Sequence, residues 1–202
     1  MGHLLWMAFL MAIMDRMFGT VAVGISLSLY PQWTEMLERH RKHNLFKKDG
    51  AIVAPGGLTW EKFRNETKDK PLMEKIEVVN NLWNRRPWKD DTRDWDMEDK
   101  WATPLEFCYK GGDCKAYAIA KMLTLKELGV DCPMRLVIGV KDEVEHAVLI
   151  IEVENILYIL DNNSNVVIPY YFYKNFQPRD SLTESHVWTH LKHLSSKDVM
   201  HH

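Results

Sequence analysis

The residues best suited to chemistry lie around Cys114, in the stretch Gly111-Gly112-Asp113-Cys114. Asp113 is a preferred helix N-cap residue, and the helix-forming run 116–128 that follows ends at Gly129, a typical C′ residue. The pattern predicts that Cys114 lies in the first turn of a helix. There the unpaired N–H groups and the helix dipole favour a thiolate, the reactive form of cysteine. The alternative is an ordinary buried cysteine, since most unpaired cysteines are small apolar residues.

A predicted hairpin downstream favours the catalytic interpretation. The expected strands are rich in β-branched residues and span 134–140, 146–153 and 156–160. If the last two strands turn on Glu154-Asn155, His146 and Asp161 become diagonal neighbours on one face, with Cβ atoms about 7–8 Å apart. A nucleophile, a base and an orienting acid are the groups that covalent acyl chemistry requires. The alternative is a structural histidine, one of nine, and an aspartate that only shapes a turn.

An ordered series of motifs around Cys114 resembles a known family. The motifs are Trp101-Ala102-Thr103-Pro104-Leu105-Glu106-Phe107, Gly112-Asp113-Cys114, Tyr117-Ala118-Ile119-Ala120-Lys121 and Leu128-Gly129. In this order they resemble the bacterial transglutaminase-like cysteine proteinases. The resemblance implies an α+β, papain/transglutaminase-like fold in which the nucleophile helix packs on an antiparallel sheet. It also implies that Cys114 is the nucleophile, His146 the general base and Asp161 the residue that orients it.

The same resemblance implies a cysteine endopeptidase that cleaves a membrane-tethered surface adhesin in biofilm control, under an inner-membrane regulatory receptor. It further suggests that Trp95 and Trp101 wall the substrate cleft. Asp113 is a further candidate for the substrate cleft or the oxyanion site, and the backbone N–H of Cys114 at the helix start is a candidate oxyanion donor. Two other functions stay open: acyl transfer to an amine, as in true transglutaminases, and a catalytically inactive protein-binding module.

One departure from the family concerns calcium. In the family the cysteine is usually followed by Glu-Asp, and carboxylates flanking the cysteine bind calcium in a known member. Here Asp113 is retained, but Lys115 and Ala116 stand at the next two positions. Calcium takes about six to eight oxygen ligands, prominently carboxylates. We therefore expect that no cofactor is required and that the calcium site is lost or binds calcium only weakly. Lys115 can instead act as a built-in cation beside Asp113.

The N-terminal segment 1–28 is apolar and admits several interpretations. Residues 4–14 and 17–29 are apolar runs separated by Asp15-Arg16, and no Lys or Arg precedes them. An export signal cleaved within 19–28, a membrane anchor and a buried N-terminal helix all fit. The family resemblance favours export to the periplasm, followed by a catalytic domain at 29–194 and a frayed tail at 195–202. The net charge of −2 makes nucleic acid an unexpected partner.

The remaining polar and aromatic segments predict structural roles. Cys108 and Cys132 do not fit zinc-site spacings, and they either pair in an exported protein or remain free thiols. The acidic segment 90–99 lacks the glycine and glutamate of an EF-hand. Further on, the aromatic residues of 170–176 are expected to pack on the core. The stretch 184–194 predicts a short closing helix.

Overall fold

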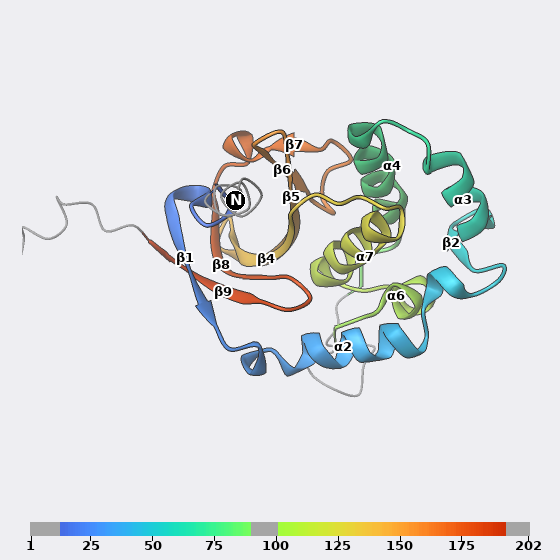
Figure 1. The fold of residues 1–202 in the computed structure, drawn as a ribbon, viewed down its shortest axis with the longest axis horizontal. Coiled ribbons are helices and arrows are strands. Elements are labelled where there is room, and N and C mark those ends of the chain that lie inside the picture. The colour runs from blue at the N-terminus through green and yellow to red at the C-terminus, as the bar shows by residue number, and fades with distance from the viewer. Residues whose placement is uncertain (1–12, 90–100, 193–202) are drawn as a thin grey trace, which may run out of the picture.

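The structure, a computed structural model, describes residues 13–89 and 101–192, and one antiparallel sheet forms its centre (Figure 1). The sheet has seven strands in the spatial order β1-β9-β8-β4-β5-β6-β7. These strands are β1 (Thr20–Ile25), β4 (Met134–Lys141), β5 (Val144–Val153), β6 (Ile156–Leu160), β7 (Ile168–Pro169), β8 (Phe176–Leu182) and β9 (Val187–Lys192). A separate ribbon pairs β2 (Ile52–Ala54) with β3 (Leu58–Thr59).

Helices gather on one side of this sheet, and α7 packs against β4 and β5 (Figure 1). The helices are α2 (Pro31–Lys42), α3 (Trp60–Thr67), α4 (Leu72–Asn84), α6 (Pro104–Lys110) and α7 (Cys114–Glu127). Every α7 residue from Ala116 to Leu125 is buried, so the helix is enclosed on nearly all sides. A large apolar core joins these helices to the sheet. The architecture confirms the predicted α+β fold, with the helix that begins at Cys114 packed on an antiparallel sheet.

A second, smaller core involves the chain before β1. Met14 and Met17 are almost fully buried there, against side chains of β4, β5, β6 and β8. Asp15 forms an ion pair of 2.7 Å with the buried Arg135 on β4. Strand β1 then pairs along its whole length with β9. Part of the apolar segment 1–28 is thus packed into this structure, while residues 1–12 lie outside the described ranges.

Most predicted elements appear, and the stretch after β8 differs. The three predicted strands correspond to β4, β5 and β6, and the turn lies at Glu154-Asn155, so that Val153 pairs with Ile156. The predicted closing helix over 184–194 is wrong: residues 187–192 form β9. Because β9 lies between β1 and β8, its backbone groups are bonded on both sides, which outweighs a modest local helix preference. Among the helices within 13–89 and 101–192, none has the length and apolarity needed to cross a bilayer.

Candidate active site

Cys114 is the first residue of α7, and its position is fixed by the cap before it. Asp113 Oδ1 accepts hydrogen bonds from the backbone N–H groups of Lys115 (3.0 Å) and Ala116 (3.3 Å). The loop before the cap needs its glycines. A Cβ on Gly112 would lie 2.5 Å from the Cβ of Ala116, and Gly111 has a φ of +79°, a conformation that L side chains rarely adopt. Cys114 therefore sits at the positive end of a tightly held helix.

His146 and Asp161 form a hydrogen-bonded pair at the end of the β5–β6 hairpin. The register pairs Leu149 with Leu160, so the next residues outward bring Asp161 close to His146, as the sequence predicts. His146 Nε2 lies 2.8 Å from Asp161 Oδ1, and both side chains are buried. Opposite His146 on β4 stands Gly139, where a Cβ would lie only 2.2 Å from the backbone oxygen of Gln177. A glycine is therefore required for β8 to approach β4 at the level of the histidine.

The carboxylate of Asp161 has further donors that hold it in place. Tyr173 Oη donates to Oδ2 at 2.6 Å, and the backbone N–H of Asn163 donates to Oδ1 at 3.0 Å. Burial alone would raise the pKa of Asp161, but the bonds from His146, Asn163 and Tyr173 lower that pKa to about 2. Burial and the bond to Asp161 together raise the pKa of Tyr173. Asp161 is thus ionised at neutral pH, and Tyr173 stays a neutral donor.

Cys114 lies close enough to His146 to affect its protonation. Burial lowers the pKa of His146, but its hydrogen bonds to Asp161 and Cys114, together with their charges, raise that pKa to about 9. Because Nε2 faces Asp161, the other ring nitrogen, Nδ1, remains for the cysteine. At neutral pH the imidazole is therefore cationic, so it can donate a proton beside the sulfur. The three residues can supply a nucleophile, a proton carrier and an orienting acid.

A donor for a developing oxyanion also stands at this helix start. The N–H of Cys114 is the first of α7, so no carbonyl within the helix accepts it. Asp113 takes the two N–H groups that follow, Lys115 and Ala116, and leaves the N–H nearest the sulfur for a substrate oxygen. Asp113 therefore acts as the cap that holds the start of α7.

The other predicted site residues lie elsewhere. Trp101 is only 3% exposed and packs edge-on against Tyr30 and Trp33, so it belongs to the core and does not form an open cleft wall. Trp95 lies outside the described residues. Cys108 and Cys132 are free thiols, as is Cys114.

The two other cysteines have environments that favour the thiol. Burial raises the pKa of Cys108 to about 11, against the opposing effect of Arg86. Burial and the nearby carboxylates of Asp131 and Glu152 raise the pKa of Cys132. Cys114 alone among the three has a histidine partner in the described residues.

The residues near Cys114 do not fit calcium in the part of the chain that the structure describes. Both oxygens of Asp113 are engaged: Oδ1 caps α7, and Oδ2 lies 2.6 Å from the Lys115 ammonium. Within residues 13–89 and 101–192, no group of three or more His, Cys, Asp or Glu side chains is arranged to hold a metal. An ammonium beside the only flanking carboxylate repels a divalent cation.

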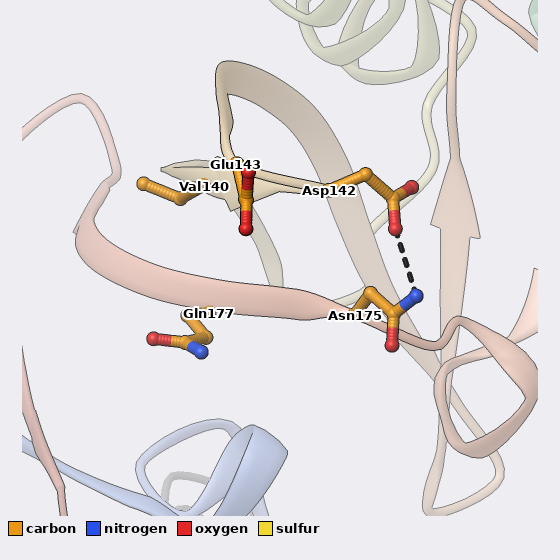
Figure 2. A pocket seen from close by; sticks show the side chains of 5 residues that line it. All are labelled: Val140, Asp142, Glu143, Asn175 and Gln177. Carbon is orange, nitrogen blue, oxygen red and sulfur yellow. Dashed lines mark hydrogen bonds between the residues drawn. The ribbon is translucent and has the colours of Figure 1, made fainter.

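One surface pocket of the sheet is separate from this site. Figure 2 shows it at the turn between β4 and β5 and the start of β8, where Asp142 Oδ1 accepts a 2.7 Å hydrogen bond from Asn175. Its other lining residues are Val140, Glu143 and Gln177. None of the three candidate catalytic residues lines it, so we assign it no role in the chemistry.

Sequence reasoning missed the groups that surround Asp161. Tyr173 was expected only to pack on the core, although its hydroxyl bonds the carboxylate. Asn84 on α4 donates to the backbone oxygens of Asp161 (2.9 Å) and Ser164 (2.8 Å). No local spacing connects these residues with Asp161. The available signal was the pair of asparagines at positions 80 and 84, one helical turn apart in an otherwise apolar stripe.

Comparisons with known proteins identify the family and agree with the fold. The family described as bacterial transglutaminase-like cysteine proteinase BTLCP matches residues 59–196. A solved structure of Legionella pneumophila LapG is 24% identical, with a TM-score of 0.59, over 83% of this chain and 90% of that chain. Calcium-bound LapG from the same organism is also 24% identical, with a TM-score of 0.60, over 81% and 91%.

EGTA-treated Legionella pneumophila LapG, again 24% identical, has a TM-score of 0.59 over 77% of this chain and 84% of that chain. At this identity, the structural likeness shows the fold. No curated protein matches the chain. The family match spans well over half of the sequence, from the ribbon that contains β3 to the end of the sheet. The chain is a member of the bacterial transglutaminase-like cysteine proteinases, a family of cysteine proteases.

Proposed function

We propose that this protease cleaves peptide bonds with Cys114 as nucleophile, His146 as proton carrier and Asp161 as the orienting acid. The observation that carries the proposal is the 2.8 Å bond between His146 and Asp161, with Cys114 close enough to raise the pKa of the imidazole. The three residues come from separate elements: the start of α7, strand β5 and the position directly after β6.

The chemistry follows from these positions. The Cys114 thiolate attacks the peptide carbonyl, and the resulting oxyanion is bound by the N–H of Cys114. His146, protonated at the start, gives its proton to the leaving amine as the carbon–nitrogen bond breaks and a thioester forms. The neutral imidazole then takes a proton from water, which hydrolyses the thioester and regenerates the thiolate and the imidazolium. Asp161 remains ionised throughout and holds the ring.

The proposed substrate is a membrane-tethered surface adhesin, cleaved in the periplasm during biofilm control, with regulation by an inner-membrane receptor. The support is the family resemblance and the likeness of the fold to LapG. A purified candidate adhesin fragment is the direct probe: cleavage by the wild-type protein and none by Cys114→Ala supports the proposal.

The alternative acyl acceptor is an amine. The same incubation, with a labelled primary amine added, separates the two reactions, because a transglutaminase incorporates the label and a protease releases new termini. We expect new termini without incorporation. Incorporation without hydrolysis would contradict the proposal, as would cleavage that persists in Cys114→Ala.

We infer in addition that activity does not depend on calcium. The support is the ion pair between Lys115 and Asp113, which places an ammonium beside the carboxylate that precedes Cys114. Lys115 stabilises the Asp113 cap by its charge, as a metal ion would. EGTA should leave the rate unchanged, and calorimetric titration should detect no tight calcium binding to the wild-type protein. Loss of activity in EGTA that calcium restores would contradict this inference.

A further inference from the structure

Trp88 is an exposed tryptophan held beside the loop that leads into Cys114. Its backbone forms a parallel bridge with Gly112, and the N–H of the next residue, Lys89, donates to the backbone oxygen of Gly112 at 3.1 Å. Paired strands lie about 4.8 Å apart, and Gly112 is close to the nucleophile in sequence, so the Cα atoms of Trp88 and Cys114 are at most about 12 Å apart. An extended peptide covers that distance with about three to four residues.

The short segment that carries Trp88 is anchored to three elements of the fold. Arg86 Nη1 donates to the backbone oxygen of Cys108 on α6 at 3.1 Å, and Nη2 donates to a backbone oxygen of β2 at 3.2 Å. The backbone oxygen of Arg86 accepts a 2.6 Å hydrogen bond from Tyr117 Oη on α7. With these bonds on one side of it and the bridge on the other, Trp88 has a fixed place relative to Cys114.

The bridge leaves one edge of this segment open. In a parallel bridge of this kind the bonds to Gly112 come from the residues before and after Trp88, so the N–H and C=O of Trp88 itself face away from the glycine loop. Within residues 13–89 and 101–192, neither group is bonded to another backbone group. Such an edge is a template on which another extended chain can form main-chain hydrogen bonds.

The side chain of Trp88 differs from those of the core tryptophans. Trp88 is 59% exposed, whereas four other tryptophans are at most 3% exposed: Trp33, Trp60, Trp83 and Trp101. A single exposed apolar side chain is ordinary on a protein surface. An exposed indole on an anchored segment, with an open strand edge and a nucleophile beside it, is suited to binding, because it offers a large rigid contact area at little cost in conformational entropy.

We propose that Trp88 is a substrate-binding residue, at which an extended peptide is recognised beside the bond that is cleaved. The main chain of the peptide pairs with the N–H and C=O of Trp88, and the indole packs on a large apolar side chain of the peptide, within about four residues of that bond. This role rests on the proposed function, because it requires Cys114 as the nucleophile. An aspartate at the same substrate position would lose hydration against the negative face of the ring.

The first measurement is the KM for the candidate adhesin fragment. Trp88→Ala should raise KM by about 10- to 50-fold and change kcat by less than about 3-fold, because the indole binds the ground state and the transition state alike. Trp88→Phe keeps part of the ring and should raise KM by only about 3-fold. Iodoacetamide is too small to use the peptide site, so the rate at which it alkylates Cys114 should be the same in the wild type and in Trp88→Ala.

Substitutions in the substrate then identify the contact. Mass spectrometry of the products locates the cleaved bond, and each large apolar residue within about four positions of it is replaced by aspartate in turn. One of these replacements should raise the KM of the wild-type protein by about 10-fold. The same replacement should change the KM of Trp88→Ala by less than about 2-fold, because the contact is already absent.

Leu191→Ala is the matched control at an exposed apolar position. Leu191 is 54% exposed on β9, and strands β8 and β4 lie between β9 and the strand that carries His146. This variant should keep the wild-type KM for the fragment. Thermal unfolding of the three variants establishes that each is folded, which is expected for Trp88→Ala because the removed side chain is mostly exposed.

The outcomes are separable. A Trp88→Ala protein with the wild-type KM overturns the role of Trp88 and leaves the proposed function intact. Slower alkylation of Cys114 with an unchanged KM also overturns it, since the tryptophan would then only hold the nucleophile loop. If every aspartate replacement affects the wild type and Trp88→Ala equally, the apolar contact is contradicted. If the wild-type protein does not cleave the fragment, the proposed function fails, and the role of Trp88 fails with it.

Discussion

Two buried histidines of the same sheet have opposite chemistry. His146 on β5 is 8% exposed and His190 on β9 is 7% exposed, so burial does not distinguish them. The pKa of His146 rises to about 9, because its bonds to Asp161 and Cys114 outweigh the effect of burial. Burial and the positive charge of Arg135 lower the pKa of His190 to about 4. An anionic partner, rather than depth in the protein, makes one histidine a cation.

His190 has only neutral hydrogen-bond partners. Its Nε2 lies 2.8 Å from Ser181 Oγ and its Nδ1 lies 3.1 Å from Thr20 Oγ1. Arg135, also on this side of the sheet, stacks on the ring of Trp188 at 3.8 Å. With two hydroxyl partners and a cation nearby, the imidazole stays neutral. The comparison therefore separates a histidine suited to catalysis from one suited to joining strands.

Replacing each histidine by alanine should give the largest difference in activity between the two sites. His146→Ala removes the proton carrier, so kcat/KM should fall by roughly a hundred- to ten-thousand-fold, while the fold persists. His190→Ala should leave the activity per folded molecule unchanged and lower the thermal stability. Hydrolysis rates and thermal unfolding of both variants test this. Equal loss of activity in the two variants, at equal folded fraction, would show that the sheet as a whole is being perturbed.

Removing the anionic partner should make His146 behave more like His190. Asp161→Asn keeps the shape but removes the charge, so the pKa of His146 should fall from about 9 toward the ordinary histidine value of 6.5. Since His146 is charged only below its pKa, the alkaline limit of activity should fall with it. Asp180→Asn, at another buried aspartate of the sheet, is the matched control and should leave this limit in place. A pH–rate profile that does not move in Asp161→Asn would be inconsistent with the role of the carboxylate.

The two histidines should affect stability at opposite ends of the pH range. In the folded protein His190 stays neutral down to about pH 4, whereas an unfolded histidine takes up a proton near pH 6.5. Its contribution to the free energy of unfolding is therefore complete above pH 6.5 and is lost as the pH falls, by about 3 kcal/mol in total. His146 keeps its proton up to about pH 9, so its contribution is full below 6.5 and is lost as the pH rises through 9. Urea unfolding of the wild type and of His190→Asn across this pH range measures the difference in their free energies of unfolding. A difference that does not change with pH would contradict the neutral state of His190.

The smallest effect concerns the hydroxyl that bonds Asp161. Tyr173→Phe removes one donor from the carboxylate and should reduce kcat/KM by about 5- to 10-fold, equivalent to about 1 kcal/mol. Tyr171→Phe, at a half-exposed tyrosine two residues away, should change nothing. Measurement of kcat/KM for the two variants under the same conditions tests this prediction. Equal rates in both would mean that His146 and Asn163 orient Asp161 without Tyr173.

The β5–β6 hairpin was predictable because its information is local. The turn residues Glu154-Asn155 set the register, and both have positive φ, as a tight turn of this kind requires. Alternation along the strands then places His146 near Asp161. The Cys114 helix was equally predictable, since Asp113 caps it and the glycines before it are needed locally.

The groups behind Asp161 could not be predicted, because they depend on contacts between distant parts of the chain. Tyr173 and Asn84 reach Asp161 from different directions, and their side chains have other common uses. For β9, the local sequence suits a helix, and only pairing with β1 and β8 decides the outcome. The same applies to residues 13–25, whose apolar character fits both an export signal and a segment packed on Arg135 and His190. Cleavage within 19–28 stays a prediction, and only cleavage after Ile25 would remove the whole of β1 from the sheet.

Competitive alkylation of the three cysteines of the wild-type protein tests the central claim most directly. Each molecule carries its own controls, because Cys108 and Cys132 are free thiols whose pKa values are raised. With limiting iodoacetamide at pH 6–7, mass spectrometry should find Cys114 modified at least about ten times faster than either of them. This preference should disappear in His146→Ala. Equal labelling of the three cysteines in the folded wild-type protein would contradict the paired thiolate and imidazolium from which the proposed chemistry is derived.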